Sequence, residues 1–243
     1  MALFTIADLH LSNGSDHAMD VFGSRWQSYT EKLEKNWRHM VSEDDTVVIP
    51  GDISWAMHLA EAREDFAFLD ALPGRKLLSK GNHDFWWETA AKLNRFFDDN
   101  GFHTFSLLYN NAHVIEDYIV CGTRGWFLEE DQQQTVGKVD FSKMVNREVM
   151  RLKLSLDAAT ALRQGGHKDK EILVFLHFPP VWNAFACNEI LDVLREFGVK
   201  RCYHGHIHGV YTRPPVQELD GGLKLYNVAS DFLNFMPYRI LPT

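Results

Sequence analysis

The sequence of 243 residues predicts an α/β fold, on the strength of two observations. Short apolar runs, such as TVVIP at residues 46–50, alternate with longer stretches that have the spacing of amphipathic helices. Between residues 104 and 121 this rhythm gives way to short strand-like segments, which predict an added antiparallel portion. Because no internal repeat, low-complexity segment or linker interrupts the sequence, we expect one domain over residues 1–243.

The N-terminal part of the chain contains three expected strands, each followed by a helix. Apolar and β-branched runs predict the strands Leu3–Ala7, Thr46–Pro50 and Lys76–Ser79. Amphipathic spacing predicts helices over Trp26–Met40, His58–Leu72 and Phe85–Asp99. Ser24 is the start signal of the first helix, while Pro73-Gly74 and Asn100-Gly101 end the other two.

The remainder of the chain begins with the antiparallel portion. Its expected strands are Thr104–Leu108, His113–Glu116 and Tyr118–Cys121. The irregular stretch 122–140 is a candidate lid or insertion, and an ordinary surface loop is an equal alternative. After it we expect a helix over Phe141–Gln164, a strand over Ile172–Leu176, a helix over Cys187–Phe197, a strand over Arg201–His204, and further strands between Val210 and Val228.

Composition and charge narrow the function classes. Hydrophobic residues make up 45% and charged residues 24%, which is typical of a folded globular protein rather than a disordered one. The formal net charge of -8 argues against nucleic acid as the partner. It does not argue against a small phosphorylated substrate, because bound divalent cations reverse the field locally.

Cysteine usage and the N-terminus bear on location. The 3 cysteines include no CxxC pair, which argues against a structural zinc site or a disulfide framework and suits a reducing cytoplasm. The opening MALFTIADLHLS lacks the features of a signal peptide, and no stretch approaches the roughly 18 apolar residues of a membrane span. We therefore expect a cytoplasmic protein without membrane contact. Nothing in the sequence indicates its oligomeric state.

Polar clusters follow five of the expected strands. The clusters are Asp8-Leu9-His10, Gly51-Asp52, Gly81-Asn82-His83-Asp84, His177, and Gly205-His206-Ile207-His208. Ligands of open α/β sheets bind outside the carboxyl ends of strands, so these clusters can converge in space. Carboxylate, imidazole and amide donors suit iron, manganese or zinc. The i, i+2 spacing within Asp8-x-His10 and His206-x-His208 lets both members of each pair point to one side of an extended segment.

In this order, the clusters resemble the calcineurin-like metallophosphoesterase superfamily, and the resemblance runs from residue 3 to about residue 230. It implies a four-layer αββα sandwich with two metal ions. One ion would be held by Asp8, His10 and His208, and the other by Asn82, His177 and His206, with Asp52 bridging both. The resemblance also implies that His83 lies near the leaving group and that Asp84 orients it. One departure is Trp55, which stands where many members carry an acidic residue or Asn.

The activity expected from this set is hydrolysis of a phosphomonoester or phosphodiester. Two cations would lower the pKa of a bridging water, and His83 would protonate the departing oxygen as a general acid. A small molecule or nucleotide is the preferred substrate, because the chain is acidic and lacks an obvious set of arginines flanking the site loops. The alternatives are a non-catalytic scaffold with the same fold and a different metal enzyme such as an amidohydrolase, whose ligand spacing fits less well.

Two residues are candidates for substrate contact. Arg124, in CGTRGW, follows an expected strand and could clamp a phosphate, although a surface salt bridge is an equal alternative. Asn13 lies in the loop after the first cluster and could face the site.

Overall fold

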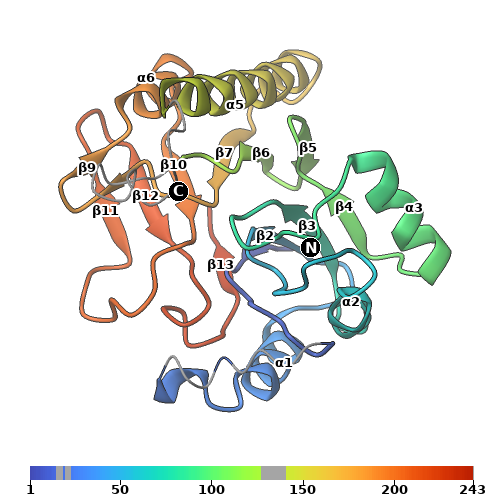
Figure 1. Ribbon diagram of the computed structural model, residues 1–243. Coiled ribbons are helices and arrows are strands. Elements are labelled where there is room, and N and C mark those ends of the chain that lie inside the picture. Colours follow the sequence, from blue (N-terminus) through green and yellow to red (C-terminus); the bar gives the residue numbers. More distant parts are fainter. Residues whose placement is uncertain (15–18, 20–22, 127–140, 243) are drawn as a thin grey trace.

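Two β-sheets pack face to face, and helices cover the outer side of each sheet (Figure 1). The computed structural model describes residues 1–14, 19, 23–126 and 141–242. Within these residues the first sheet has five strands, in the spatial order Tyr238–Ile240 (β13), Leu3–Thr5 (β1), Thr46–Pro50 (β2), Arg75–Ser79 (β3) and Phe105–Leu107 (β4). Strands β1 to β4 are parallel, and β13 pairs with β1 in the antiparallel sense.

The second sheet has six strands in the same described part of the chain. In spatial order they are Val216–Glu218 (β11), Lys224–Asn227 (β12), Arg201–His204 (β10), Glu171–Leu176 (β7), Tyr118–Thr123 (β6) and Ala112–Ile115 (β5). The four central strands are parallel, and the two edge strands are antiparallel to their neighbours. A separate short hairpin consists of Val181–Trp182 (β8) and Phe185–Ala186 (β9).

The helices form the two outer layers. Tyr29–Met40 (α1), Arg63–Asp70 (α2) and Ala90–Asn100 (α3) cover the first sheet, and a short 3-10 helix, Ser24–Trp26 (η2), precedes α1. Phe141–Gln164 (α5) and Asn188–Glu196 (α6) cover the second sheet and lie along the top of Figure 1. The layers therefore follow the order helix, sheet, sheet, helix, which confirms the expected αββα sandwich.

Successive side chains of each strand point to opposite faces of its sheet, and this creates separate apolar cores between the layers. In β2, Val47 and Ile49 pack with the helices of the first sheet, whereas Val48 packs between the two sheets. In β7, Val174 packs toward α5 and α6, and Phe175 packs between the sheets. Each fully buried side chain of this kind contributes roughly 1.5–3 kcal/mol. Strands buried on both faces explain why their sequences are continuous apolar runs.

Several sequence predictions need correction. The segment expected at Thr104–Leu108 is β4, which pairs parallel with β3 instead of joining an antiparallel group. Because α3 connects them, β3, α3 and β4 form a crossover unit, and only β5 and β6 make the expected antiparallel pair. Three helices also begin at least three residues later than expected. α1 starts at Tyr29, α2 starts at Arg63, and α3 starts at Ala90, where Thr89 accepts a hydrogen bond from the Lys92 N–H as the N-cap.

The stretch proposed as a lid is only partly described. β6 continues to Thr123, so the first residues of 122–140 belong to a strand, and residues 127–140 lie outside the described part of the chain. The strands β8, β9 and β13 were not expected from the sequence. Among the described residues, no helix is long and apolar enough to cross a lipid bilayer.

Candidate metal centre

The polar clusters converge at the carboxyl ends of strands from both sheets. The loops after β1, β2 and β3 come from the first sheet, and those after β7 and β10 from the second. The sheets are joined directly at this point, because the Ala7 N–H donates to the Val228 carbonyl at 2.8 Å and the Ser230 N–H donates to the Ala7 carbonyl at 2.9 Å. The site therefore lies on the seam between the two halves of the sandwich.

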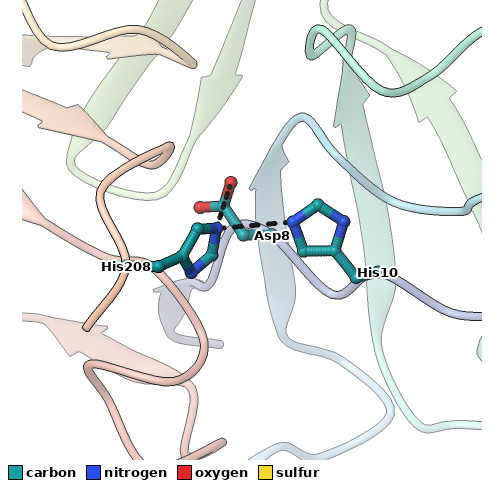
Figure 2. A group of neighbouring side chains, drawn as sticks. All are labelled: Asp8, His10 and His208. Carbon is teal, nitrogen blue, oxygen red and sulfur yellow. Dashed lines mark hydrogen bonds and ion pairs between the residues drawn. The ribbon is translucent and has the colours of Figure 1, made fainter. Parts of the chain in front are cut away.

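The first group of candidate ligands is Asp8, His10 and His208, whose donor atoms all lie within 4.8 Å of one another. His208 Nε2 is 3.4 Å from His10 Nε2 and 3.6 Å from Asp8 Oδ1. Figure 2 shows both imidazoles and the carboxylate turned toward one another. A cation with bonds of about 2.1 Å requires donor atoms roughly 3–3.5 Å apart, so this spacing fits a single ion.

The second group is Asp52, His177 and His206, which meet the same distance limit of 4.8 Å. The Nδ1–H of His177 donates to the Pro50 carbonyl at 3.1 Å, so its Nε2 carries a free lone pair. That Nε2 lies 2.6 Å from Oδ1 of Asn82. The lone pairs of His177 Nε2 and Asn82 Oδ1 at this distance suit binding of one cation by both atoms. The structure thus brings Asn82 into this group.

Asp52 connects the two groups through one oxygen atom. Its Oδ2 lies 3.8 Å from His10 Nε2 and 3.5 Å from His177 Nε2. Its other oxygen, Oδ1, accepts a hydrogen bond from the His83 N–H at 2.8 Å, which fixes the orientation of the carboxylate. The arrangement fits a carboxylate shared by two ions.

The backbone at four of these residues is in the left-handed region. The φ angles are 59° at Asp8, 47° at His10, 51° at Asp52 and 70° at His206. Asp and His tolerate this region better than most residues, although each instance costs of order 1–3 kcal/mol. Hydrogen bonds hold the conformation, since the Asp8 N–H donates to the Gly51 carbonyl and the His10 N–H to the Asp52 carbonyl, each at 3.0 Å.

Two glycines allow the ligand loops to approach each other closely. A Cβ atom at Gly81 would overlap the Asp52 carboxylate and backbone, and one at Gly205 would overlap the Asp8 carboxylate. The absence of a side chain is therefore a steric requirement of the site at both positions.

Burial pushes the charged groups of the site toward their neutral forms. It raises the pKa of Asp52 well above its usual range, and the nearby Asp84 and Asp8 carboxylates add to this effect. Burial also lowers the pKa of His177 and of His10, with neighbouring imidazoles adding to both shifts. Cations would reverse the effect on the carboxylates and would bind the neutral imidazoles, so the donor set fits bound metal.

Three supporting residues were missed in the sequence. Asp231 accepts a hydrogen bond from His208 Nδ1–H at 2.8 Å, Ser230 donates its hydroxyl to the Asp8 carbonyl at 2.6 Å, and Tyr29 donates its hydroxyl to the His10 carbonyl at 2.7 Å. Burial alone would lower the pKa of His208, but hydrogen bonds to Asp231 and Asp8 outweigh it and raise this pKa to about 10. Ser230 and Asp231 follow β12 within four residues, a signal of the same kind as the clusters recognised after other strands.

His83 lies beside the metal groups, but the expected role of Asp84 is wrong. The His83 ring is 5.6 Å from that of His10 and 4.4 Å from that of Trp55, measured between centroids. Its Nδ1 is buried and has no hydrogen-bond partner among the described residues. The Asp84 carboxylate instead accepts hydrogen bonds from the backbone N–H groups of Gly81, Asp52 and Ile53 at 2.7–2.9 Å. It holds two ligand loops together and does not orient the imidazole.

The other candidate residues have mixed outcomes. Arg124 lies next to the site, since its carbonyl accepts from the His177 N–H at 3.0 Å, and its guanidinium is 4.0 Å from the buried Glu148. It is therefore not in a surface salt bridge, and its contact with substrate stays a prediction. Asn13 is exposed, and its N–H donates to Asp65 at 2.7 Å, so its proposed contact with substrate also stays a prediction. Trp55, the departure from the family pattern, stacks on His10 with the ring centroids 5.0 Å apart.

Comparison with known proteins agrees with this geometry. Two solved structures have a similar fold: the phosphopantetheinyl hydrolase PptH from Mycobacterium tuberculosis (14% identity, 100% of this chain and 96% of that chain, TM-score 0.56) and TT1561 of Thermus thermophilus (12% identity, 95% and 89%, TM-score 0.57). No curated protein sequence matches the chain. Residues 1–210 match the family described as calcineurin-like phosphoesterase. Because this match spans most of the sequence, the chain belongs to the calcineurin-like phosphoesterase family.

Proposed function

We propose that the protein is a dinuclear metal-dependent phosphoesterase that acts on a small phosphorylated molecule or a nucleotide. The observation that carries the proposal is the position of Asp52, whose Oδ2 lies within 4 Å of donor atoms from both ligand groups, at 3.8 Å and 3.5 Å. A carboxylate shared in this way is typical of two-metal hydrolytic sites. Manganese, iron and zinc all suit the mixture of imidazole, carboxylate and amide donors.

When bound, two such cations stabilise the negative charge of the phosphoryl group and lower the pKa of a water molecule. The chain's own residues prepare the site for this chemistry. Pro50 and Asp231 accept the Nδ1–H protons of His177 and His208, which leaves both Nε2 atoms directed at the metal positions. The imidazole of His83, beside this centre, would donate a proton to the departing ester oxygen.

Metal content and substrate preference test the proposal together. Full-length protein would be stripped of metal, reloaded with Mn²⁺, Fe²⁺ or Zn²⁺, and analysed for metal per chain by mass spectrometry. We expect two ions per chain and hydrolysis of p-nitrophenyl phosphate or bis-p-nitrophenyl phosphate, with the better substrate distinguishing a monoesterase from a diesterase.

A matched pair of variants makes this test specific. His206→Ala removes a candidate ligand and should lower both metal content and turnover, whereas His103→Ala removes an exposed imidazole elsewhere and should change neither. Fewer than two ions in the wild type, with no hydrolysis of either ester, would contradict the proposal and point to a non-catalytic scaffold.

A cytoplasmic location is a further part of the proposal. Cys121, Cys187 and Cys202 are free and buried, which supports a reducing environment because no disulfide is needed to stabilise the fold.

A further inference from the structure

A cavity of about 390 Å³ opens where β3, β6 and α5 meet. Its walls include four cationic side chains, which are Lys80, Arg124, Arg147 and Arg151, and we call it the basic pocket. Lys80 and Arg124 directly follow β3 and β6, whereas Arg147 and Arg151 lie one turn apart on α5. Its volume is within the range of small-ligand sites, roughly 300–1,000 Å³.

The carboxylates of the described residues near the basic pocket do not balance its positive charge. Glu148 is fully buried and is shared by Arg151, at 2.7 Å, and Arg124, at 4.0 Å. Glu88, which also lines the pocket, forms an ion pair with Lys92 at 3.0 Å. Among the residues that the structure describes, the pocket therefore has an excess of positive charge, although the whole chain has a formal net charge of -8.

The guanidinium groups of two arginines are not fully paired within the described residues. The buried Nε of Arg124 has no hydrogen-bond partner among the described residues. The Arg147 guanidinium contacts Met144 Sδ at 3.0 Å, and no carboxylate of the described residues forms an ion pair with it. Arginine is well suited to bind phosphate through paired N–H groups.

The basic pocket lies close to the metal centre along two chain segments. Lys80 is two residues before Asn82, so their Cα atoms are at most about 7.6 Å apart. On the other side, the Arg124 carbonyl accepts hydrogen bonds from the N–H groups of His177 and Phe178, at 3.0 and 2.9 Å. The two sites are therefore neighbours, at a separation that one organic molecule with two anionic groups can span.

Aromatic side chains form another part of the wall. The rings of Trp87 and Tyr109 both line the pocket, with centroids 6.3 Å apart and planes at 42°. Such rings offer a flat apolar surface beside the cations, which suits the organic part of a ligand rather than a free inorganic anion.

We propose that the basic pocket binds a second anionic group of the substrate, such as a phosphate, while the ester phosphate occupies the metal centre. The substrate class is then an organic molecule with two separated phosphate-like groups. Arg124 and Arg147 bind the second group, and Trp87 and Tyr109 contact the part that joins the two. This inference rests on the proposed function, because the first group is taken to be at the metals.

Two phosphonates test the proposal, because their P–C bonds resist hydrolysis. Hexane-1,6-diphosphonate has an anionic group at both ends of a flexible chain, and hexylphosphonate has only one. Titration calorimetry with the Mn²⁺-loaded full-length chain should show at least about tenfold tighter binding of the diphosphonate, since its second end binds intramolecularly. Equal affinities would overturn the proposal.

A variant and its control assign the preference to the pocket. Arg147→Met should reduce the preference for the diphosphonate at least about fivefold, and its melting temperature should show that the chain is folded. Arg163→Met, on the same helix but outside the pocket, should keep the preference. An unchanged preference in Arg147→Met would also overturn the proposal.

The same measurements separate this proposal from the proposed function. Hydrolysis of p-nitrophenyl phosphate without any preference for the diphosphonate would retain the phosphoesterase and remove the second-anion site. A preference for the diphosphonate that depends on Arg147, in a chain that hydrolyses no ester, would retain the pocket and remove the phosphoesterase. If neither probe binds, the proposed pocket is overturned.

Discussion

His83 and Asp84 are neighbours in the sequence, but their side chains have separate tasks. The His83 ring lies beside His10 and Trp55 at the edge of the metal groups. The Asp84 carboxylate instead accepts hydrogen bonds from the loops after β2 and β3. Substitution of His83 should therefore affect mainly activity, whereas substitution of Asp84 should affect mainly stability.

His83→Ala should retain metal and lose most activity. The ring contributes no atom to either candidate ligand group, and general acids typically contribute a factor of about 10²–10⁴. Metal content and turnover of an ester with a poor leaving group measure the two effects. Turnover at the wild-type rate on such a substrate would contradict the role of His83 as the acid.

Asp84→Asn should lower the free energy of unfolding by about 1–3 kcal/mol. The reason is that the side-chain NH2 group replaces one carboxylate oxygen and cannot accept hydrogen bonds from the backbone N–H groups. Urea denaturation measures the loss. Asp98→Asn, at an exposed position on α3, is the control and should remain within about 0.5 kcal/mol of the wild type. Wild-type stability combined with lost activity would instead support an orienting role for Asp84.

Asp231→Ala should weaken metal binding about 10–100-fold, because His208 would lose the carboxylate that fixes its Nδ1–H. Competition with a fluorescent chelator measures the affinity. Asp220→Ala removes an exposed carboxylate near the same end of the chain and should leave the affinity unchanged. Equal affinities in the two variants would show that Asp231 does not support the metal site.

The bounds of some secondary-structure elements could be predicted from the sequence, whereas the pairing of some strands could not. The helix Phe141–Gln164 and the strands Thr46–Pro50 and Arg201–His204 were predicted with the bounds observed, because their patterns are local. The parallel pairing of β4 with β3 and the pairing of β13 with β1 were not, because both depend on distant segments. The clusters after the strands were found for the same local reason. Asp231 follows strand β12 in a similar way, but nothing local in the sequence shows that it contacts His208.

Strand β3 includes a buried lysine that makes the stability of the element depend on pH. Burial lowers the pKa of Lys76 to about 8 from 10.5, although its ammonium donates to the Leu72 carbonyl and the Thr104 hydroxyl. Between these values the unfolded chain binds the proton and the folded chain does not, so stability rises with pH. Relative to Lys76→Met, the wild type should gain about 2 kcal/mol between roughly pH 7.5 and 9.5.

Denaturation of both chains at several pH values measures this difference. The comparison cancels the contributions of tyrosine and cysteine residues, which are the same in the two chains. A constant difference across the range would show that Lys76 keeps its proton throughout.

At the scale of the molecule, the candidate metal centre joins the two sheets. The ligand groups take residues from both halves of the sandwich, and His206, Asp8 and Asp52 adopt left-handed conformations within the seam. Bound ions would offset the burial of these charged groups and the backbone strain. Sequence alone predicted the α/β class, whereas the four-layer arrangement followed from the family resemblance, because sheet-on-sheet packing leaves no local pattern.

Removal of metal should therefore lower the melting temperature of the whole chain. A metal present at about 100 times its dissociation constant stabilises the folded state by about 2.7 kcal/mol, which corresponds to roughly 5–10 °C for a chain of this size. Calorimetry before and after chelation measures the shift, and added Mn²⁺ should restore it. His206→Ala should respond less to the chelator, and an equal response would locate the stabilising ion elsewhere.

The left-handed backbone at Asp8, His10, Asp52 and His206 limits how the site can change during evolution or engineering. Asp, Asn and His are the non-glycine residues that enter this region most readily, and they are also good metal donors. Exchanges among these three residue types keep both properties. Glu or Cys would retain a donor atom but disfavour the backbone, so a redesign toward thiolate ligation must first rebuild the loops that present them.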